Sequence, residues 1–237
     1  MTDPLPIIAL RLLIGLGASL ELAVLVLLSG TFGGVLLATI SNFGGRLGRS
    51  FIVAILYLAR GVPLLVWIFA IFFVLPQVGL RLSAFTTAAV ALTIFASVTI
   101  AEIFRGGILA VPRSQTEGAL ALGLSPLRAF VLIVLPQALR VVLPGMISQF
   151  IFLIKASALI SLLGVSEMMH VGREIIERTL QGFEVMSLIW IFYTLVCLPL
   201  GIFGRWLERR LSNRGELDPR SIGLAGPSSI AAPSLRG

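Results

Sequence analysis

The feature that most restricts the fold of this chain is a series of long apolar segments that contain almost no charge. Five of them are separated by shorter polar stretches: one within residues 7–40, for which we favour 18–40, and four at residues 51–75, 85–109, 137–163 and 185–207. Each is close to or longer than the roughly 20 residues that a helix needs to cross the hydrocarbon core of a bilayer. Because hydrocarbon offers no partner to backbone N–H and C=O groups, segments that cross it must be helical. The sequence therefore predicts an all-α integral membrane protein with about five transmembrane helices.

The composition supports a membrane environment. Hydrophobic residues make up 57% of the 237 residues and charged residues only 12%, whereas soluble domains have roughly 25% charged residues. The formal net charge of +7 would suit nucleic-acid binding if the basic residues formed one face. The arginines are instead spread between the apolar segments, so we expect membrane lipid, and no nucleic acid, as a partner.

Positive charge is concentrated in the first loop, in the third loop and after the last span: Arg46, Arg49, Arg113, Arg128, Arg205, Arg209, Arg210, Arg214 and Arg220. Because cytoplasmic loops carry an excess of Lys and Arg, we expect the N-terminus outside and the C-terminus in the cytoplasm. We divide the chain into an N-terminal segment (1–17), a transmembrane domain (18–211) and a tail (212–237). The tail is rich in Ser, Pro and Gly, which predicts a disordered cytoplasmic segment.

The third loop is too apolar to be a simple connector. Ser114 and Glu117 have the spacing of a capping box, and Gly123 is placed to end the helix that follows in the left-handed conformation. Ser125 and Pro126 suit the N-cap and first position of a second helix. We therefore predict two short helices with a sharp turn between them. Their apolar residues need a surface to cover them, either lipid headgroups or a groove on a partner protein.

The same loop resembles the cytoplasmic signature of ATP-binding cassette importer permeases. That signature is Glu-Ala-Ala, three residues, Gly, nine residues, Ile, one residue and Leu-Pro, and the matching residues are Glu117, Gly118, Ala119, Gly123, Ile133, Leu135 and Pro136. Gly118 stands where the family usually has Ala. Four shorter motifs are similar to those of polar amino-acid permeases: 60–65, 101–107, 135–140 and 207–210.

This resemblance implies the type I importer permease fold, with about five spans, an external N-terminus and short cytoplasmic coupling helices. It also implies a multi-pass protein of the bacterial inner membrane that carries a polar amino acid or similar small polar solute. Its expected partners are a cytoplasmic ATP-binding subunit, a periplasmic or extracellular solute-binding protein, and a second permease subunit that is identical or homologous. The residues of the loop signature would contact the ATPase.

The chain itself has no site for ATP. A phosphate-binding loop needs a Gly-Lys-Ser or Gly-Lys-Thr sequence, and the single lysine, Lys155, stands between Ile154 and Ala156. We therefore expect a transport subunit rather than an enzyme, with ATP hydrolysis on a separate chain. Cys197 lies in an apolar span, and His170, expected in a solvated loop, has no Cys or His at metal-ligand spacing. We expect neither a cofactor nor a metal.

Polar residues inside the predicted spans are candidates for the solute pathway, because an ionised group there costs about 2.5–3.5 kcal/mol. They are Glu21, Glu102, Lys155 and Ser157. Structural interpretations stay open beside this one. Glu21 would be an interfacial carboxylate, Glu102 would pair with Arg105 on one helix face, and Lys155 would extend to the interface or pair with a neighbouring subunit. Related permeases often have an acidic residue directly after this lysine, and its absence here argues against binding of a cationic side chain. Two alternatives stay open: Lys155 contacts a solute carboxylate, or the chain is the non-binding half of a heterodimer.

Two other functions were weighed against an importer permease. A stand-alone ion-coupled carrier would need paired repeats with broken helices around a site at the membrane centre, and no such repeat is evident in the sequence. A membrane-embedded enzyme would need a convergent set of catalytic or metal-binding residues, yet the predicted spans contain neither His nor Asp. The importer permease is therefore the function that the sequence favours.

Overall fold

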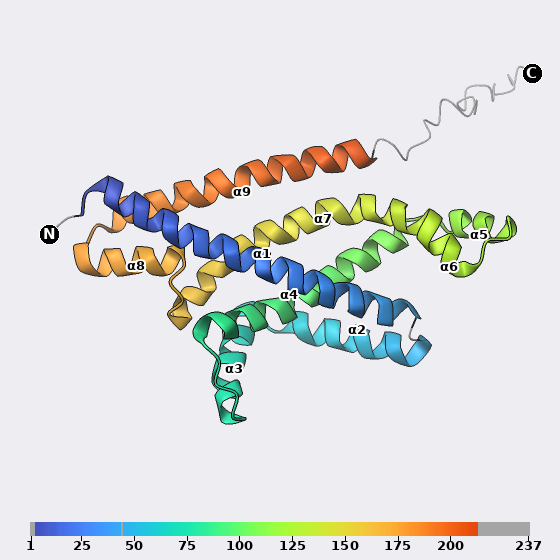
Figure 1. Ribbon diagram of the computed structural model, residues 1–237, viewed down its shortest axis with the longest axis horizontal. Helices are drawn as coiled ribbons and strands as arrows, with labels where there is room; N and C mark the ends of the chain where they lie inside the picture. Colours follow the sequence, from blue (N-terminus) through green and yellow to red (C-terminus); the bar gives the residue numbers. More distant parts are fainter. Residues whose placement is uncertain (1–2, 44, 213–237) are drawn as a thin grey trace, which may run out of the picture.

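The computed structural model describes residues 3–43 and 45–212, and every regular element in these ranges is helical (Figure 1). The elements are α1 (Leu5–Phe43), α2 (Gly45–Gly61), α3 (Leu64–Gln77), α4 (Ala84–Leu109), α5 (Arg113–Ala121), α6 (Pro126–Ala129), a π-helical segment (Phe130–Val134), α7 (Leu135–Ala156), a 3₁₀ segment (Ser157–Leu163), α8 (Met168–Thr179) and α9 (Gly182–Ser212). Almost all of the predicted tail, 212–237, lies outside the described residues.

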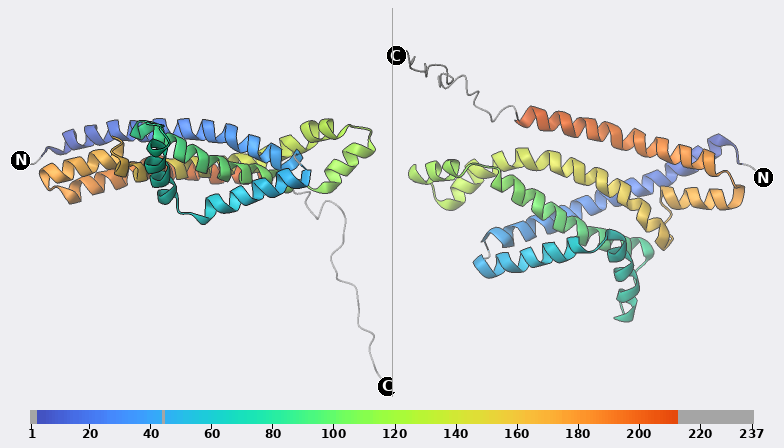
Figure 2. Two further views of the ribbon diagram at one scale, coloured as in Figure 1. Left: turned by 90° about the horizontal axis from the view of Figure 1, so that it is seen from below. Right: turned by 180° about the vertical axis from the view of Figure 1, so that it is seen from behind.

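Four of these helices are long and apolar enough to cross a membrane: those at Leu5–Ser41, Ala84–Leu109, Pro126–Leu163 and Gly182–Leu211. They run roughly side by side along the long axis of the molecule, with α8 near one end and α5 and α6 at the other (Figures 1 and 2). The all-α membrane fold predicted from the sequence is confirmed, as four spans, or five if the bent pair α2–α3 counts as one more.

The first span begins earlier than residue 18, where we expected it. α1 is one helix of 39 residues from Leu5, so at about 1.5 Å per residue it is much longer than the roughly 30 Å hydrocarbon core. Its first turns bury Ile8 and Leu12 against Met168 of α8. Gly15 permits this approach, because a Cβ there would lie 2.8 Å from the Cα of Met168. Packing against α8 thus extends the helix into the segment that we had separated.

The second span is broken, and a single helix over 51–75 is wrong. The segments Ile52–Ala59 and Leu64–Gln77 meet at an angle of 100°. Pro63 explains the break, since proline lacks an N–H and disfavours helical geometry at the residue before it. A hydrogen bond connects α2 and α3 across the break: Trp67 Nε1 donates to the carbonyl oxygen of Ala59 at 3.0 Å.

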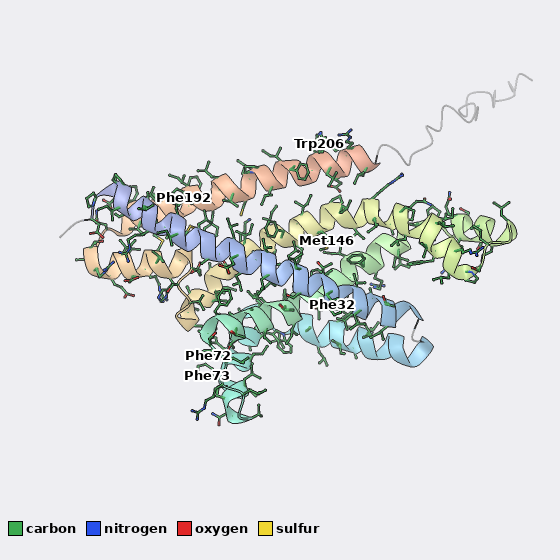
Figure 3. All side chains as sticks on the ribbon, in the orientation of Figure 1. Phe32, Phe72, Phe73, Met146, Phe192 and Trp206 are labelled. Atoms are coloured by element: carbon green, nitrogen blue, oxygen red, sulfur yellow. The ribbon has the colours of Figure 1, made fainter. Side chains whose placement is uncertain are left out.

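α3 leaves the bundle sideways and has apolar side chains on all its faces, including Phe72 and Phe73 (Figure 3). Its 14 residues reach only about 21 Å, less than the hydrocarbon thickness. Ile68 is its one fully buried side chain among the described residues. The rest of its surface therefore requires lipid or another protein subunit around it.

Small residues allow α1 and α4 to pack closely. A Cβ at Gly33 would lie 2.3 Å from Oγ of Ser97, and one at Gly34 would lie 2.7 Å from the Ile100 side chain. Close approach through glycine is a common way for membrane helices to associate, because lipid tails are as apolar as leucine and packing replaces the hydrophobic effect. Ile100 of this contact belongs to a large buried cluster that also includes Leu92.

Candidate functional site

The loop that carries the permease signature begins with α5 and ends it in a left-handed turn. Gly123 has a φ of +82°, as predicted. Gly123 N donates to the Leu120 carbonyl at 3.0 Å, and Leu124 N donates to the Ala119 carbonyl at 3.2 Å. These two bonds are the Schellman arrangement, which satisfies carbonyls at the helix end. The chain therefore changes direction sharply in the four residues between the end of α5 at Ala121 and the start of α6 at Pro126.

The start of α5 differs from the prediction. The helix begins at Arg113 with Pro112 as its N-cap, and no side chain accepts a bond from its first turn. Ser114 and Glu117 thus lie inside the helix, and the predicted capping box is wrong. The physical reason is Pro112, whose fixed φ already suits a helix start, so that the helix begins before the serine can serve as its cap.

The second helix begins as predicted but does not end. Ser125 accepts a hydrogen bond from Arg128 N at 3.4 Å, with Pro126 in the first turn of α6. After four residues α6 continues through the π-helical segment into α7, so it is the start of the span rather than a separate short helix. Pro136 accounts for the π-helical segment, because it has no N–H to donate to the Leu132 carbonyl and its ring clashes with that carbonyl, a conflict that a wider turn relieves.

The loop presents apolar side chains to its surroundings. Ala119 and Ala129 are buried and hold α5 against the start of the span. Leu122 is 86% exposed and Leu127 is 69% exposed, with Leu120, Val131 and Leu132 also exposed. Of the signature residues, Glu117, Gly118, Gly123 and Pro136 are exposed, and Ile133 and Leu135 are half-buried. An exposed apolar surface of this kind needs lipid headgroups or a partner protein to cover it.

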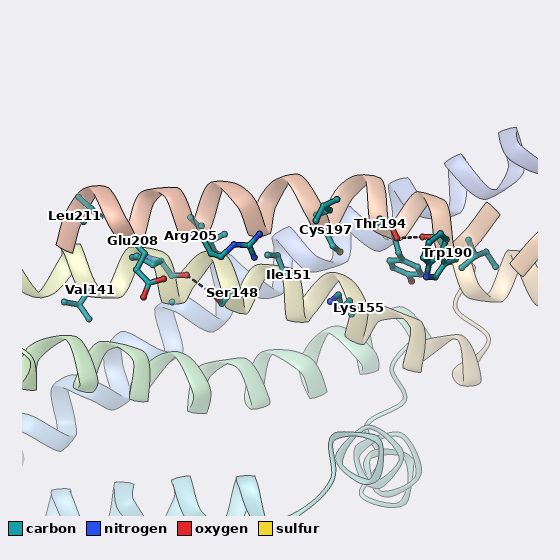
Figure 4. A pocket seen from close by; sticks show the side chains of 18 of the residues that line it. Val141, Ser148, Ile151, Lys155, Trp190, Thr194, Cys197, Arg205, Glu208 and Leu211 are labelled. Atoms are coloured by element: carbon teal, nitrogen blue, oxygen red, sulfur yellow. Dashed lines mark hydrogen bonds between the residues drawn. The ribbon is translucent and has the colours of Figure 1, made fainter. Parts of the chain in front are cut away.

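A second feature is a long groove between α7 and α9, with a volume of about 1340 Å³ (Figure 4). It extends along α9 from Met186 to Leu211, about 37 Å at the usual helical rise. Four charged side chains line it: Arg140, Lys155, Arg205 and Glu208. Lys155 is exposed and lies across the groove from Cys197 and Thr194 (Figure 4).

The other predicted pathway residues are not on this groove. Ser157 is fully buried and donates its hydroxyl to the Ile154 carbonyl at 2.8 Å. Glu21 is exposed on α1, and Glu102 is half-buried on α4. Neither glutamate is among the residues that line the groove. Of the four candidates, Lys155 alone faces it.

Several groove residues were not identified from the sequence, notably Arg140, Trp190, Arg205 and Glu208. They come from two helices that are far apart in the chain, and nothing in a single sequence shows that these helices face each other. The spacing of Arg205 and Glu208, three residues apart on one helix face, was the available signal.

At the opposite end of the molecule from the loop, a buried carboxylate joins α8 to α1. Glu167 is 1% exposed and caps α8 by accepting from His170 N at 2.7 Å. Its other oxygen accepts from the hydroxyl of Ser19 on α1 at 3.2 Å. The pKa of the Glu167 carboxyl is raised overall, because the effect of burial exceeds the opposing effect of these hydrogen bonds. His170 is half-buried in α8 with Nδ1 3.2 Å from the Ser161 carbonyl, so its expected place in a solvated loop is wrong.

The described residues contain no group of three His, Cys, Asp or Glu side chains placed to hold a metal ion. The site therefore consists of two parts: an apolar reversing loop at one end of the bundle, and a groove with unpaired charges that extends away from it. One continuous helical stretch, residues 126–156, connects the two parts, since it begins at the loop and forms one side of the groove.

Comparison with known proteins gives consistent results. The model of the family described as "Binding-protein-dependent transport system inner membrane component" matches residues 30–213. The glutamine transport system permease protein GlnP of Escherichia coli strain K12 is 36% identical over 206 residues, covering 86% of this chain and 94% of that protein. The probable glutamine ABC transporter permease protein GlnM of Bacillus subtilis is 38% identical over 152 residues, which are 64% of this chain and 70% of that one.

A solved structure is also similar. The crystal structure of an amino acid ABC transporter with histidines has a chain that superposes with a TM-score of 0.82 at 30% sequence identity. The match covers 89% of this chain and all of the other chain. The arrangement of helices described above is therefore shared with that transporter chain over nearly its whole length.

Proposed function

Since the chain belongs to the family of binding-protein-dependent transport system inner membrane components, we propose that it is the permease subunit of an ATP-driven importer that forms the pathway for a polar amino acid or similar small polar solute. The observation that carries this proposal is the α5–α6 loop, where a signature of ATPase-coupled permeases coincides with an exposed apolar turn. The glutamine permeases that resemble the chain support the solute class.

The loop is the proposed contact with a separate ATPase subunit. Leu122 and Leu127 stand on either side of the turn at Gly123 and would enter an apolar groove of that subunit. Glu117 is exposed one turn into α5 and would pair with a basic group at the rim of the contact. Because α6 continues into α7, movement of the ATPase would reach the groove through one helix.

The groove between α7 and α9 is the proposed solute pathway. Its length is comparable to the membrane thickness, and it carries charge where lipid contact would favour apolar residues only. Lys155 is the residue of this chain that we expect to contact the solute. A second permease subunit, identical or homologous, would close the open side of the groove, and membrane lipid would surround the pair.

The expected orientation follows from the arginines of the sequence. The loop of α5 and α6 would face the cytoplasm together with the C-terminus, and the N-terminus and α8 would lie outside. A solute-binding protein would then deliver the solute at the end formed by α8. The family description places these proteins at the inner membrane, as multi-pass chains.

A stand-alone ion-coupled carrier is the alternative. Carriers of that kind have paired broken helices in two repeats, and the described residues contain one sharply bent pair, α2–α3. That difference favours the importer.

The proposal is tested by reconstituting the chain in liposomes with an ATP-binding cassette ATPase and a solute-binding protein from the same source. ATP inside should drive uptake of radiolabelled L-glutamine, and a protonophore or sodium ionophore should leave it unchanged. Uptake that needs an ion gradient, proceeds without the ATPase, or does not occur with any of the twenty common amino acids would refute the importer function.

A further inference from the structure

The charges of the groove between α7 and α9 are unbalanced. Three of its charged residues are cations, Arg140, Lys155 and Arg205, and Glu208 is the sole carboxylate among the described residues that line it. None of the four takes part in an ion pair within the described part of the chain, in contrast to Arg11 and Arg178, which both contact Glu174 at the α8 end. The groove therefore has a net charge of +2, from three positive side chains and one negative.

Lys155 lies far from the one carboxylate. It faces the level of Cys197 and Thr194, whereas Glu208 is near the other end of the groove (Figure 4). Cys197 and Glu208 are eleven residues apart on α9, which corresponds to about 16 Å along the helix. Arg205 lies between them, so the charge nearest to Lys155 along α9 is another cation. Its ammonium group has no hydrogen-bond acceptor among the described residues.

Lys155 stands in the last turn of α7, where the negative end of the helix dipole stabilises a positive charge. This interaction explains in part why a lysine is tolerated there. The interaction with the helix dipole uses none of the three N–H donors of Lys155. The helix continues directly into the 3₁₀ segment, whose backbone N–H groups bond to the carbonyls of this turn. An exposed ammonium group with free donors inside a membrane span is costly unless an anion reaches it. A carboxylate of a passing solute would provide both the charge and the acceptor oxygens.

Two hydroxyl groups of the groove, those of Ser148 and Thr194, offer acceptors rather than donors to a solute. The Ser148 hydroxyl donates to the Pro144 carbonyl at 3.2 Å, and the Thr194 hydroxyl donates to the Trp190 carbonyl at 2.8 Å. With the donor hydrogens engaged, both oxygens remain available as acceptors. They would receive the N–H groups of a solute ammonium, but without a full negative charge. Near Lys155, a solute carboxylate is thus matched by a cation, and a solute ammonium only by neutral oxygens, because Glu208 lies near the other end of the groove.

We propose that the groove between α7 and α9 selects solutes of net negative charge, the class of the dicarboxylic amino acids, with Lys155 binding a solute carboxylate and cationic amino acids excluded. The proposal rests on the proposed function, since it assigns the solute class of the same pathway. Neutral amino acids would bind more weakly than dicarboxylic ones, because they lack the second carboxylate that would interact with the remaining positive charge of the groove.

The test uses the purified complex of the full chain with its ATPase, without a binding protein, so that selection by the permease is measured alone. The probes are radiolabelled L-glutamate, L-glutamine and L-arginine, whose side-chain charges are −1, 0 and +1; L-glutamate and L-glutamine have the same size. We expect binding in that order. Lys155→Met should weaken L-glutamate binding by about tenfold or more, as expected for loss of a charged hydrogen bond. Lys155→Arg should keep most of it, and Lys155→Glu should admit L-arginine.

Arg178→Met is the matched control, because it removes one positive charge from an exposed residue outside the groove; it should bind all three probes as the wild type does. Equal binding of L-glutamine and L-glutamate, binding of L-arginine by the wild type, or no binding of any probe at millimolar concentration would overturn the proposal. So would an unchanged L-glutamate affinity in Lys155→Met. If these results occur in a complex that retains its ATPase and hydrolyses ATP, the solute class is wrong while the importer function stands; loss of the ATPase from the wild-type chain would refute the function itself.

Discussion

Replacement of Gly123 by valine tests the turn between α5 and α6. Gly123 has a φ of +82°, a region that costs an L-residue about 1–2 kcal/mol, and a β-branched side chain is restricted further at χ1. A Cβ at this position would meet no atom within 4 Å, so the cost in the free chain is conformational rather than steric. The chain can avoid it only by giving up the hydrogen bonds of Gly123 N and Leu124 N to α5.

Because the ATPase would have to bind the strained turn, the cost should appear in the binding equilibrium. About 1–2 kcal/mol corresponds to roughly five- to thirtyfold weaker binding. The assay is titration of purified ATPase subunit onto the chain in lipid nanodiscs, with ATP-driven uptake measured in parallel in liposomes. Membrane insertion should be normal, since Gly123 lies between α5 and α6 and outside the long apolar part of every span.

Two variants control for effects other than the left-handed turn. Gly118→Ala changes another exposed glycine of the same loop, but inside α5, where a Cβ also meets nothing within 4 Å. Alanine should stabilise that helix by up to about 1 kcal/mol and leave ATPase binding intact. Gly123→Asn should recover most of the affinity, because Asn tolerates the left-handed region. If Gly123→Val binds the ATPase as tightly as Gly118→Ala does, the turn is not the contact, and the coupling proposal is wrong.

Three further predictions concern packing, protonation and orientation. Gly33→Val should lower the thermal midpoint of the purified chain, because its Cβ would lie 2.3 Å from a hydroxyl oxygen of α4, whereas Gly17→Val, with nothing within 4 Å, should change it little; equal midpoints would contradict the α1–α4 contact. Since burial raises the pKa of Glu167, the folded protein holds this proton to higher pH than the unfolded chain, so the stability it contributes is present at low pH and lost as pH rises through the raised pKa. The thermal midpoint of wild type minus that of Glu167→Gln should therefore increase from pH 8 to pH 5, and a constant or opposite difference would show that the carboxyl is not buried as described. In a Cys197→Ser background, Arg81→Cys should react with an impermeant thiol reagent added outside, and Arg46→Cys should not; the reverse pattern would invert the proposed orientation.

Local chemistry explains which parts of the loop could be predicted from the sequence. The left-handed turn at Gly123 and the N-cap at Ser125 depend on residues adjacent in the chain, and both predictions are confirmed. The capping box failed because it needed a choice between two adjacent helix starts, and Pro112 decided that choice. Propensity rules rank such starts but do not resolve differences of a residue or two.

The span boundaries show the influence of tertiary contacts. Hydropathy located the apolar segments, yet it did not show that α1 extends to Leu5, since that extension depends on packing against Met168. The break before α3 was readable in principle from Gly61 and Pro63, but a proline inside an apolar run is often tolerated in membrane helices. Pro144 and Pro199 lie within α7 and α9 without ending them, so the residue type alone is not decisive.

The groove was the part least accessible from sequence. Lys155 was identified because an ionisable residue in a span is rare, and that argument needs no knowledge of its neighbours. Arg140 gave no signal of its own, and Arg205 and Glu208 gave only their spacing of three residues on one helix face. They line one groove only because α7 packs beside α9, and a three-dimensional structure is needed to show that packing.

The unbroken helical path from Pro126 to Ala156 has a mechanical consequence. Its 31 residues form a stiff rod of about 45 Å at the usual rise, with the loop that would touch the ATPase at one end and Lys155 at the other. If the rod tilts about its loop end by about 5°, the far end is displaced by about 4 Å, following from that length. This displacement is close to the width of an amino-acid backbone. A small angular change at the motor would therefore suffice to open or close the groove around its solute, and the loop need not move far to do so.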